Sequence, residues 1–174
     1  FDLNKRRIDE LKKGIDKTNE LSEKEITGSD IVFTDNPKEI SNANFIIAAV
    51  PTPVKDNKEP DLSFVESASK IIGQNIRKGS MVVFESTVYP GVTEDICVPL
   101  IEKHSGLICG KDWKIGYSPE RINPGDNEHT IEKVIKSVSG RDRESLDRIA
   151  EVYSRIVKAG AHRAPNIKTA EAAN

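Results

Sequence analysis

The stretch Met81-Val82-Val83-Phe84-Glu85-Ser86-Thr87-Val88-Tyr89-Pro90-Gly91 decides the fold. Its first four residues are apolar and do not alternate with polar residues, which is typical of a buried strand in a parallel sheet. Two hydroxyl side chains, Ser86 and Thr87, follow directly, and Pro90-Gly91 turns the chain into the next element. Because open α/β sheets bind ligands outside the carboxyl ends of their strands, we expect this strand end to carry a site.

Similar apolar runs alternate with helical patterns along the chain. Apolar strands are predicted at residues 31–34, 45–50, 81–84 and 115–117. Helices are predicted from Asn4 to about Gly14, from Ser63 to about Gly79 with Ser63 and Glu66 as a capping box, near Thr93 and Glu94, and from about Asp142. Strands separated by helices of this length imply right-handed βαβ crossovers. We therefore predict an α/β fold with a doubly wound parallel sheet.

Composition limits the classes of function. The 174 residues allow about one domain, and 26 Lys and Arg against 28 Asp and Glu give a net charge of −2. This charge predicts no nucleic-acid or membrane-surface partner, and the longest apolar run, residues 45–50, is too short to span a bilayer. Two cysteines, Cys97 and Cys109, lack metal-ligand spacing, so we expect no metal site and a reduced, cytoplasmic setting.

A second polar segment follows the strand predicted at residues 115–117. It reads Tyr117-Ser118-Pro119-Glu120-Arg121-Ile122-Asn123-Pro124-Gly125-Asp126 and places a carboxylate and a guanidinium at a strand end. Taken alone, Glu120 and Arg121 are compatible with an exposed, salt-bridged loop, and Ser86 and Thr87 with helix capping. Since open α/β sheets bind ligands at the carboxyl ends of their strands, the two segments also look like a binding site.

The two segments together resemble the UDP-glucose/UDP-mannose dehydrogenase family, specifically its UDP-N-acetylhexosamine (GlcNAc, GalNAc or ManNAc) 6-dehydrogenase branch. The UDP-glucose enzymes carry a second glutamate four residues after the first, whereas this sequence has Pro124. The resemblance therefore implies a UDP-N-acetylhexosamine as the substrate. It also implies a Rossmann-like NAD-binding domain over residues 1–164, with the first strand and the Gly-rich turn missing, and the start of a central helix over residues 165–174.

The resemblance implies NAD as the cofactor and assigns residues to it. Asp2 is expected to accept hydrogen bonds from the adenosine ribose, and Arg7 to reach the adenosine side. The remaining cofactor contacts are Val50, Pro51, Thr52, Ser86 and Thr87. Without the resemblance, Asp2 would be interpreted as a helix-capping or surface carboxylate, and Arg7 as a solvent-facing helix residue.

The implied activity is a four-electron oxidation of the sugar C6 hydroxyl to a uronic acid, for capsule or O-antigen polysaccharides. Two hydride transfers are separated by capture of the aldehyde on a cysteine thiolate, and water then releases the acid from a thioester. Glu120 and Thr87 are the expected catalytic residues, both in handling this water. The expected sugar contacts are Glu120, Arg121, Ile122 and Asn123.

Neither cysteine of this chain suits the role of the thiolate that captures the aldehyde. Cys97 and Cys109 lie in or just after an apolar helical pattern rather than at a strand end, which indicates buried thiols. We therefore expect the catalytic cysteine outside this chain, the chain alone to be inactive, and, from the resemblance, a homodimer. Two alternatives stay open: another NAD dehydrogenase of the β-hydroxyacid type, and a non-catalytic nucleotide-binding module.

Overall fold

The computed structural model describes residues 1–120 and 134–173 of the chain. Residues 1–42 and 43–174 form two compact units, and the five strands found in the described residues belong to the second. Within the described ranges, no helix is long and apolar enough to cross a membrane.

The first unit contains short, capped helices. These are α1 (Lys5–Leu11), α2 (Glu23–Thr27) and the 3-10 helix η1 (Pro37–Asn42). As predicted, Asn4 caps α1, its side chain accepting a hydrogen bond from the Arg7 N–H at 3.1 Å. Ser22 and Glu25 form a capping box at α2. Ile8 and Ile26 are the buried apolar side chains of α1 and α2.

The strand predicted at residues 31–34 is wrong. This segment has no regular secondary structure, and its Thr34 C=O accepts a backbone hydrogen bond from the Asp2 N–H at 3.1 Å. Ile31 and Val32 are 58% and 78% exposed. β-branched side chains favour a pleated, half-buried surface, but a strand forms only where an adjacent strand offers partners for its backbone hydrogen bonds. Among the described residues this run has no such adjacent strand.

The second unit is built on a five-stranded sheet whose spatial order follows the chain. Its strands are β1 (Phe45–Ala48), β2 (Met81–Phe84), β3 (Lys114–Tyr117), β4 (Lys136–Gly140) and β5 (Ala161–Arg163). β1, β2 and β3 are parallel, as predicted, with Ala48 opposite Phe84 and Phe84 opposite Tyr117. This register brings the carboxyl ends of the three strands to one edge of the sheet.

The rest of the sheet differs from the prediction. β3 and β4 are antiparallel and β4 and β5 parallel, so the predicted parallel sheet is in fact mixed, with one antiparallel pair among the described strands. The sequence pattern does not indicate β4 or β5, because Lys-Ser-Val-Ser-Gly and Ala-His-Arg contain few apolar residues. β1 pairs with β2 alone among the described strands, and its Ile47 is 45% exposed where a central strand would bury it.

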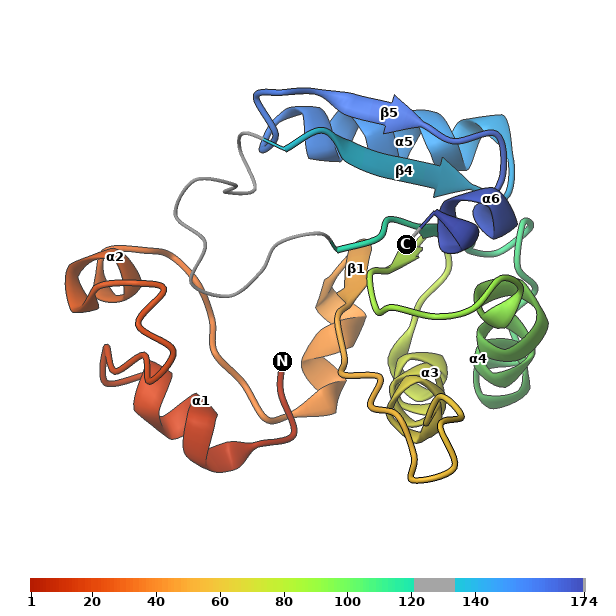
Figure 1. The fold of residues 1–174 in the computed structure, drawn as a ribbon. Coiled ribbons are helices and arrows are strands. Elements are labelled where there is room, and N and C mark those ends of the chain that lie inside the picture. The colour runs from red at the N-terminus through yellow and green to blue at the C-terminus, as the bar shows by residue number, and fades with distance from the viewer. Residues whose placement is uncertain (121–133, 174) are drawn as a thin grey trace. The chain divides into compact units, whose positions relative to one another are not determined.

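Helices cover the sheet. They are α3 (Ser63–Asn75), the π-helix η2 (Val92–Cys97), α4 (Val98–Ser105), α5 (Arg143–Ser154) and α6 (Ile167–Ala172). Figure 1 shows α3 and α4 side by side, away from α5. Met81 and Val83 of β2 belong to a buried cluster with Ile149 and Tyr153 of α5. All four β2 residues are buried, as expected for a strand covered on both faces.

One local prediction on these helices is wrong, and another is confirmed with a difference in helix type. Ser63 is the first residue of α3 rather than its cap, so the Ser63–Glu66 capping box does not form; the Asp61 carboxylate instead accepts from the Ser63 N–H at 3.0 Å. The helix expected near Thr93 begins as a π-helix. Pro99 lacks an N–H, and the Val98 N–H reaches back to the Thr93 C=O in the wider π pattern.

Gly116 of β3 lets α5 approach the sheet closely. A Cβ at this position would lie 2.1 Å from Cδ1 of Ile149 and 2.4 Å from the Ser139 C=O. Real Cβ atoms do not come this close, so the position accepts only a hydrogen. Since β3 carries Glu120 just beyond its end, this contact also fixes the strand that leads into the candidate site.

Asp142 caps α5 and pairs with β3, which ties this helix to the sheet. Its Oδ1 accepts from the Ser145 N–H at 2.7 Å, and its Oδ2 lies 2.9 Å from the Lys114 ammonium. Partial burial raises the pKa of the Asp142 carboxyl, but the hydrogen bonds from Ser145 and Lys114 outweigh it and bring the pKa to about 2. The carboxylate is therefore the stabilised form in the folded protein.

We expect Asp142→Ala to lower the free energy of unfolding by about 1 kcal/mol, because a helix loses its N-cap. Asp142→Asn keeps a capping oxygen and should retain most of that stability at neutral pH. Since the pKa in the folded state lies below the unfolded value of roughly 3.9, the advantage of the wild type over Asp142→Asn should be full above that value and should vanish as the pH falls through about 2. Urea unfolding measures both effects.

The control is Glu151→Gln, which alters an exposed ion pair with Arg155 on the same helix and should change stability by less than about 0.5 kcal/mol. An advantage of the wild type over Asp142→Asn that stays constant across the acidic range would contradict the assigned role of the Asp142 charge.

Candidate functional site

Three polar segments leave the sheet at its carboxyl edge. Residues 50–52 follow β1, Ser86 and Thr87 follow β2, and residues 118–120 follow β3. The Ser118 N–H donates to the Phe84 C=O at 3.0 Å, and the Glu120 N–H to the Glu85 C=O at 3.4 Å. The parallel register therefore puts the segments that carry Thr52, Thr87 and Glu120 at the same edge of the sheet, and the residues just before Thr87 are hydrogen-bonded to the Glu120 segment.

Ser86 is used inside the protein. Its side chain is buried; the hydroxyl donates to the Val50 C=O at 2.7 Å and accepts from the Val50 N–H at 3.0 Å. The Tyr117 hydroxyl donates to the Ser86 C=O at 3.1 Å. Ser86 thus fixes the turn after β1, so a direct cofactor contact of its hydroxyl stays a prediction, whereas its support of Val50 is visible.

Thr87 and the turn after β1 are accessible. Thr87 and Pro51 are exposed and Thr52 is half-buried. Proline fixes the backbone φ angle, so Pro51 and Pro53 stiffen the segment that carries the Thr52 hydroxyl. These groups can meet a ligand at the sheet edge with little loss of backbone freedom.

The turn beyond Thr87 is held by a buried carboxylate. Glu171 of α6 is 2% exposed, and its two oxygens accept from the Gly91 N–H at 2.5 Å and the Thr93 N–H at 2.9 Å. Gly91 has φ of 104°, a left-handed conformation that favours glycine. Glu171 thereby satisfies backbone donors at the start of η2. The sequence motif did not indicate this residue.

Glu120 lies beside a buried ammonium group. Its Oε2 atom is 3.0 Å from Nζ of Lys136, and the same Nζ lies 3.2 Å from Oε1 of Glu85. The side chains of Lys136 and Glu85 are 6% and 12% exposed, whereas that of Glu120 is 38% exposed. The Glu85 carboxylate is therefore enclosed, while Glu120 is held by Lys136 and is the more exposed of the two.

Tyr153 of α5 completes this group. Its hydroxyl donates to Oε1 of Glu85, and the Lys136 Nζ lies 5.7 Å from its ring centroid. Burial, reinforced by the Glu85 carboxylate, raises the pKa of the Tyr153 phenol, so the phenol stays a hydrogen-bond donor. Glu85, Glu120, Lys136 and Tyr153 thus form one group of interacting side chains.

Asp2 and Arg7 belong to the first unit. Asp2 is exposed, and its Oδ1 accepts from the Asn4 N–H at 2.7 Å. The Arg7 guanidinium donates to Oδ1 of the nearly enclosed Asp16 at 3.2 Å. Arg7 thus has a structural partner inside its own unit, and its role toward a cofactor stays a prediction. The predicted sugar contacts Arg121, Ile122 and Asn123 lie outside the described residues.

Both cysteines are poor nucleophiles. Cys97 and Cys109 are buried, and burial raises the pKa of the Cys97 thiol to about 12. Burial also raises the pKa of Cys109. Because the thiolate is the reactive form, the structure agrees with the inference that neither thiol attacks a substrate.

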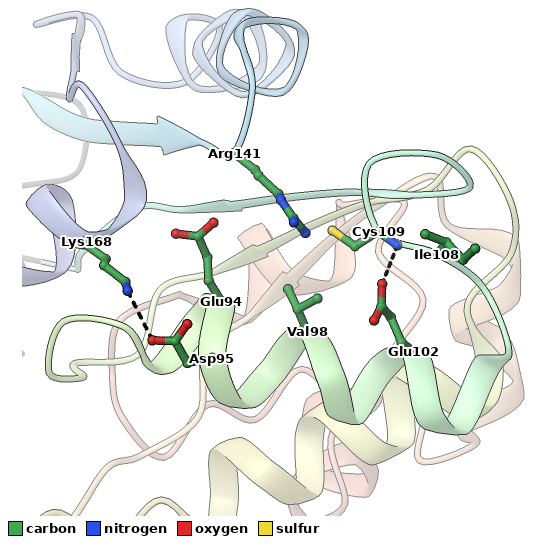
Figure 2. A pocket seen from close by; sticks show the side chains of 8 residues that line it. All are labelled: Glu94, Asp95, Val98, Glu102, Ile108, Cys109, Arg141 and Lys168. Atoms are coloured by element: carbon green, nitrogen blue, oxygen red, sulfur yellow. Dashed lines mark hydrogen bonds and ion pairs between the residues drawn. The ribbon is translucent and has the colours of Figure 1, made fainter.

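A separate pocket lies along α4. Figure 2 shows the eight side chains that line it: Glu94, Asp95, Val98, Glu102, Ile108, Cys109, Arg141 and Lys168. Lys168 pairs with Asp95 at 3.2 Å, and Glu102 accepts from the Cys109 N–H at 2.8 Å. None of the residues that the sequence assigns to the site is in this lining. Among the described residues, no group of three or more His, Cys, Asp or Glu side chains could hold a metal ion.

The family comparison matches most of the chain. Residues 1–157 match the model of the NAD-binding domain of the UDP-glucose/GDP-mannose dehydrogenase family. The mannose nucleotide in this family name is GDP-mannose, not the UDP-mannose that the resemblance named.

Curated relatives agree with this match. Protein CapL from Staphylococcus aureus is 52% identical over 173 residues, which are 99% of this chain and 41% of the relative. The UDP-N-acetyl-D-glucosamine 6-dehydrogenase of Pseudomonas aeruginosa is 47% identical over 174 residues, with the same two coverages. The chain thus spans less than half the length of these relatives.

Solved structures share the fold. A UDP-D-ManNAc dehydrogenase from Pyrococcus horikoshii superposes with a TM-score of 0.88 at 27% identity, over 98% of this chain and 41% of that one. A ternary complex of GDP-mannose dehydrogenase from Pseudomonas aeruginosa gives a TM-score of 0.88 at 26% identity, with the same coverages. The α/β, Rossmann-like class predicted from the sequence is confirmed.

Proposed function

Because this chain belongs to the UDP-glucose/GDP-mannose dehydrogenase family, we propose that the full-length protein containing it oxidises the C6 hydroxyl of a UDP-N-acetylhexosamine to the uronic acid with NAD. The observation that carries this proposal is the Glu120 carboxylate, held at the carboxyl edge of the sheet that also carries Thr87. Two relatives named UDP-N-acetyl-D-glucosamine 6-dehydrogenases, 47% and 45% identical, support the choice of substrate, as does Pro124 in place of a second glutamate.

The described residues fit NAD in each unit. The Asp2 carboxylate is exposed and oriented by the Asn4 N–H, as an acceptor for ribose hydroxyls requires. Thr52, Thr87 and the stiff Pro51 are accessible at the edge of the sheet where such folds bind nucleotides. Arg7, Val50 and Ser86 complete the proposed cofactor set, Ser86 through its hold on Val50. When bound, NAD supplies the acceptor for the hydride in each oxidation.

Glu120 acts on water in this proposal. Hydrolysis of a thioester requires removal of a proton from the attacking water, and a carboxylate positioned near the reacting carbon does this as a general base. Thr87 helps to hold the water, and Arg121, Ile122 and Asn123 contact the sugar. Cys97 and Cys109 take no part, since both thiols are buried and carry raised pKa values.

The wider setting follows from the same proposal. The product is a precursor for capsule or O-antigen polysaccharide, the reaction takes place in the cytoplasm, and the active form is a homodimer. Another β-hydroxyacid-type dehydrogenase or a non-catalytic nucleotide-binding module is less well supported, because the relatives with 45% and 47% identity carry the name of the 6-dehydrogenase.

The direct test uses the purified full-length protein with NAD and UDP-GlcNAc, UDP-GalNAc, UDP-ManNAc or UDP-glucose. Oxidation of an alcohol to an acid removes four electrons, so we expect two NADH for each uronic acid. One of the N-acetylated sugars should be preferred over UDP-glucose. Absorbance at the NADH band and mass spectrometry of the nucleotide sugar measure the ratio; no turnover with any of the N-acetylated sugars would refute the proposal.

Asp2 should select NAD over NADP. A carboxylate that accepts a hydrogen bond from the free 2′-hydroxyl of NAD repels the 2′-phosphate of NADP. Asp2→Asn should therefore weaken the binding of NAD and raise kcat/KM for NADP relative to that for NAD. Steady-state kcat/KM for both cofactors measures the ratio. The matched control is Asp9→Asn, a half-buried carboxylate of α1 that pairs with Lys5. A wild type that uses both cofactors equally well would remove Asp2 from the cofactor site.

Glu120→Gln in the full-length enzyme should preserve the fold and the first hydride transfer but slow the release of the acid. Loss of general acid–base help typically lowers a rate by roughly 10²–10⁴-fold. The expected result is a burst of NADH followed by slow turnover, with a sugar-linked enzyme visible by mass spectrometry. Glu59→Gln, in an exposed loop, is the control. Turnover of Glu120→Gln at the wild-type rate would show that Glu120 is a loop residue.

A further inference from the structure

Lys136 is the buried cation of the candidate site. It lies on β4, whose sequence Lys-Ser-Val-Ser-Gly gives no indication of burial. Its side chain is 6% exposed, and its Nζ contacts Oε2 of Glu120 and Oε1 of Glu85 at 3.0 Å and 3.2 Å. An ammonium taken out of water has a large desolvation penalty, and apolar residues often replace buried ion pairs without loss of stability. Stability alone therefore does not account for a lysine at this position.

The geometry links Lys136 to both strand ends of the site. Glu85 precedes Ser86 and Thr87 at the end of β2, and Glu120 follows β3. The Tyr153 hydroxyl donates to the same Glu85 oxygen that Lys136 contacts, so the Lys136 head has one fixed carboxylate partner in the interior. Its second partner, Glu120, is the more exposed of the two.

We infer that Lys136 is a positioning residue for Glu120. Its ammonium group is held in place by Glu85 and Tyr153, and it binds one carboxylate oxygen of Glu120. Lys136 thereby orients Glu120 toward the water that hydrolyses the thioester. This inference rests on the proposed function. It assigns no contact of Lys136 with the sugar or NAD. A misplacement of a catalytic group by about 1 Å can slow a reaction by roughly 10²-fold, so the effect of such positioning is measurable.

The test is a double-mutant cycle of Lys136→Met and Glu120→Gln in the full-length enzyme. Lys136→Met alone should leave the NADH burst intact and slow the hydrolytic phase by roughly 10–100-fold. In the Glu120→Gln background the same change should slow hydrolysis by less than about twofold, because Lys136 acts through a carboxylate that is no longer there. Decay of the sugar-linked enzyme, followed by mass spectrometry, gives the hydrolysis rate in all four proteins.

Lys136→Arg and Lys114→Met complete the design. Lys136→Arg keeps the charge and should recover part of the hydrolysis rate. If Lys136→Met does not fold, Lys136→Arg replaces it in the cycle. Its hydrolysis rate should then fall by less, and this fall should also disappear in the Glu120→Gln background. Lys114 pairs with Asp142 and Glu144 on the same sheet. Lys114→Met therefore removes another lysine that pairs with two carboxylates, and the rate of the hydrolytic phase should be unchanged in this variant.

The outcomes separate the inference from the proposed function. A wild type that oxidises a UDP-N-acetylhexosamine, with losses for Lys136 and Glu120 that simply multiply, would overturn the inference alone. Wild-type hydrolysis in a folded Lys136→Met enzyme would do the same, as would a loss in Lys136→Arg that persists in the Glu120→Gln background. A wild type that forms no NADH with any of these sugars would overturn the proposed function first.

Discussion

The register shared by β1, β2 and β3 is the constraint on which the candidate site depends. Ala48 lies opposite Phe84, and Phe84 opposite Tyr117, so the polar segments that follow these strands leave the sheet at one level. Ser86 reinforces the alignment through its two hydrogen bonds to Val50. A slip of one residue would turn the side chains of a strand to the opposite face, and the Glu120 carboxylate would no longer meet its partner on β4.

The parallel half of the sheet could be predicted from the sequence because its burial is visible locally. β2 consists of four buried apolar residues, and α5 shows its cap at Asp142 and its buried Ile149 and Tyr153 at helical spacing. Residues 31–34 show the limit of this argument. They have a similar apolar composition, yet a strand exists only through a neighbour, and local composition carries no information about that neighbour.

The site could be predicted in part for the same reason. Thr87 and Glu120 follow apolar strands directly, so their positions at the sheet edge can be inferred from the chain order. Lys136 could not be found in this way, because a lysine among serines is typical of a solvated segment; its burial depends on Glu85 and Tyr153, which are distant in sequence. The structural use of Ser86 could not be predicted either, because its hydroxyl holds the backbone of Val50, a residue far away in sequence.

The Glu171 carboxylate has a mechanical consequence for the loop that carries Thr87. Its two oxygens are shared between the N–H groups of Gly91 and Thr93, and the side chain stands on α6, a separate helix late in the chain. A rotation or shift of α6 would remove the acceptor from both N–H groups at once, and these groups are buried away from water. The Glu171 carboxylate therefore ties α6 to the turn at Gly91 and Thr93, which follows the segment that carries Thr87.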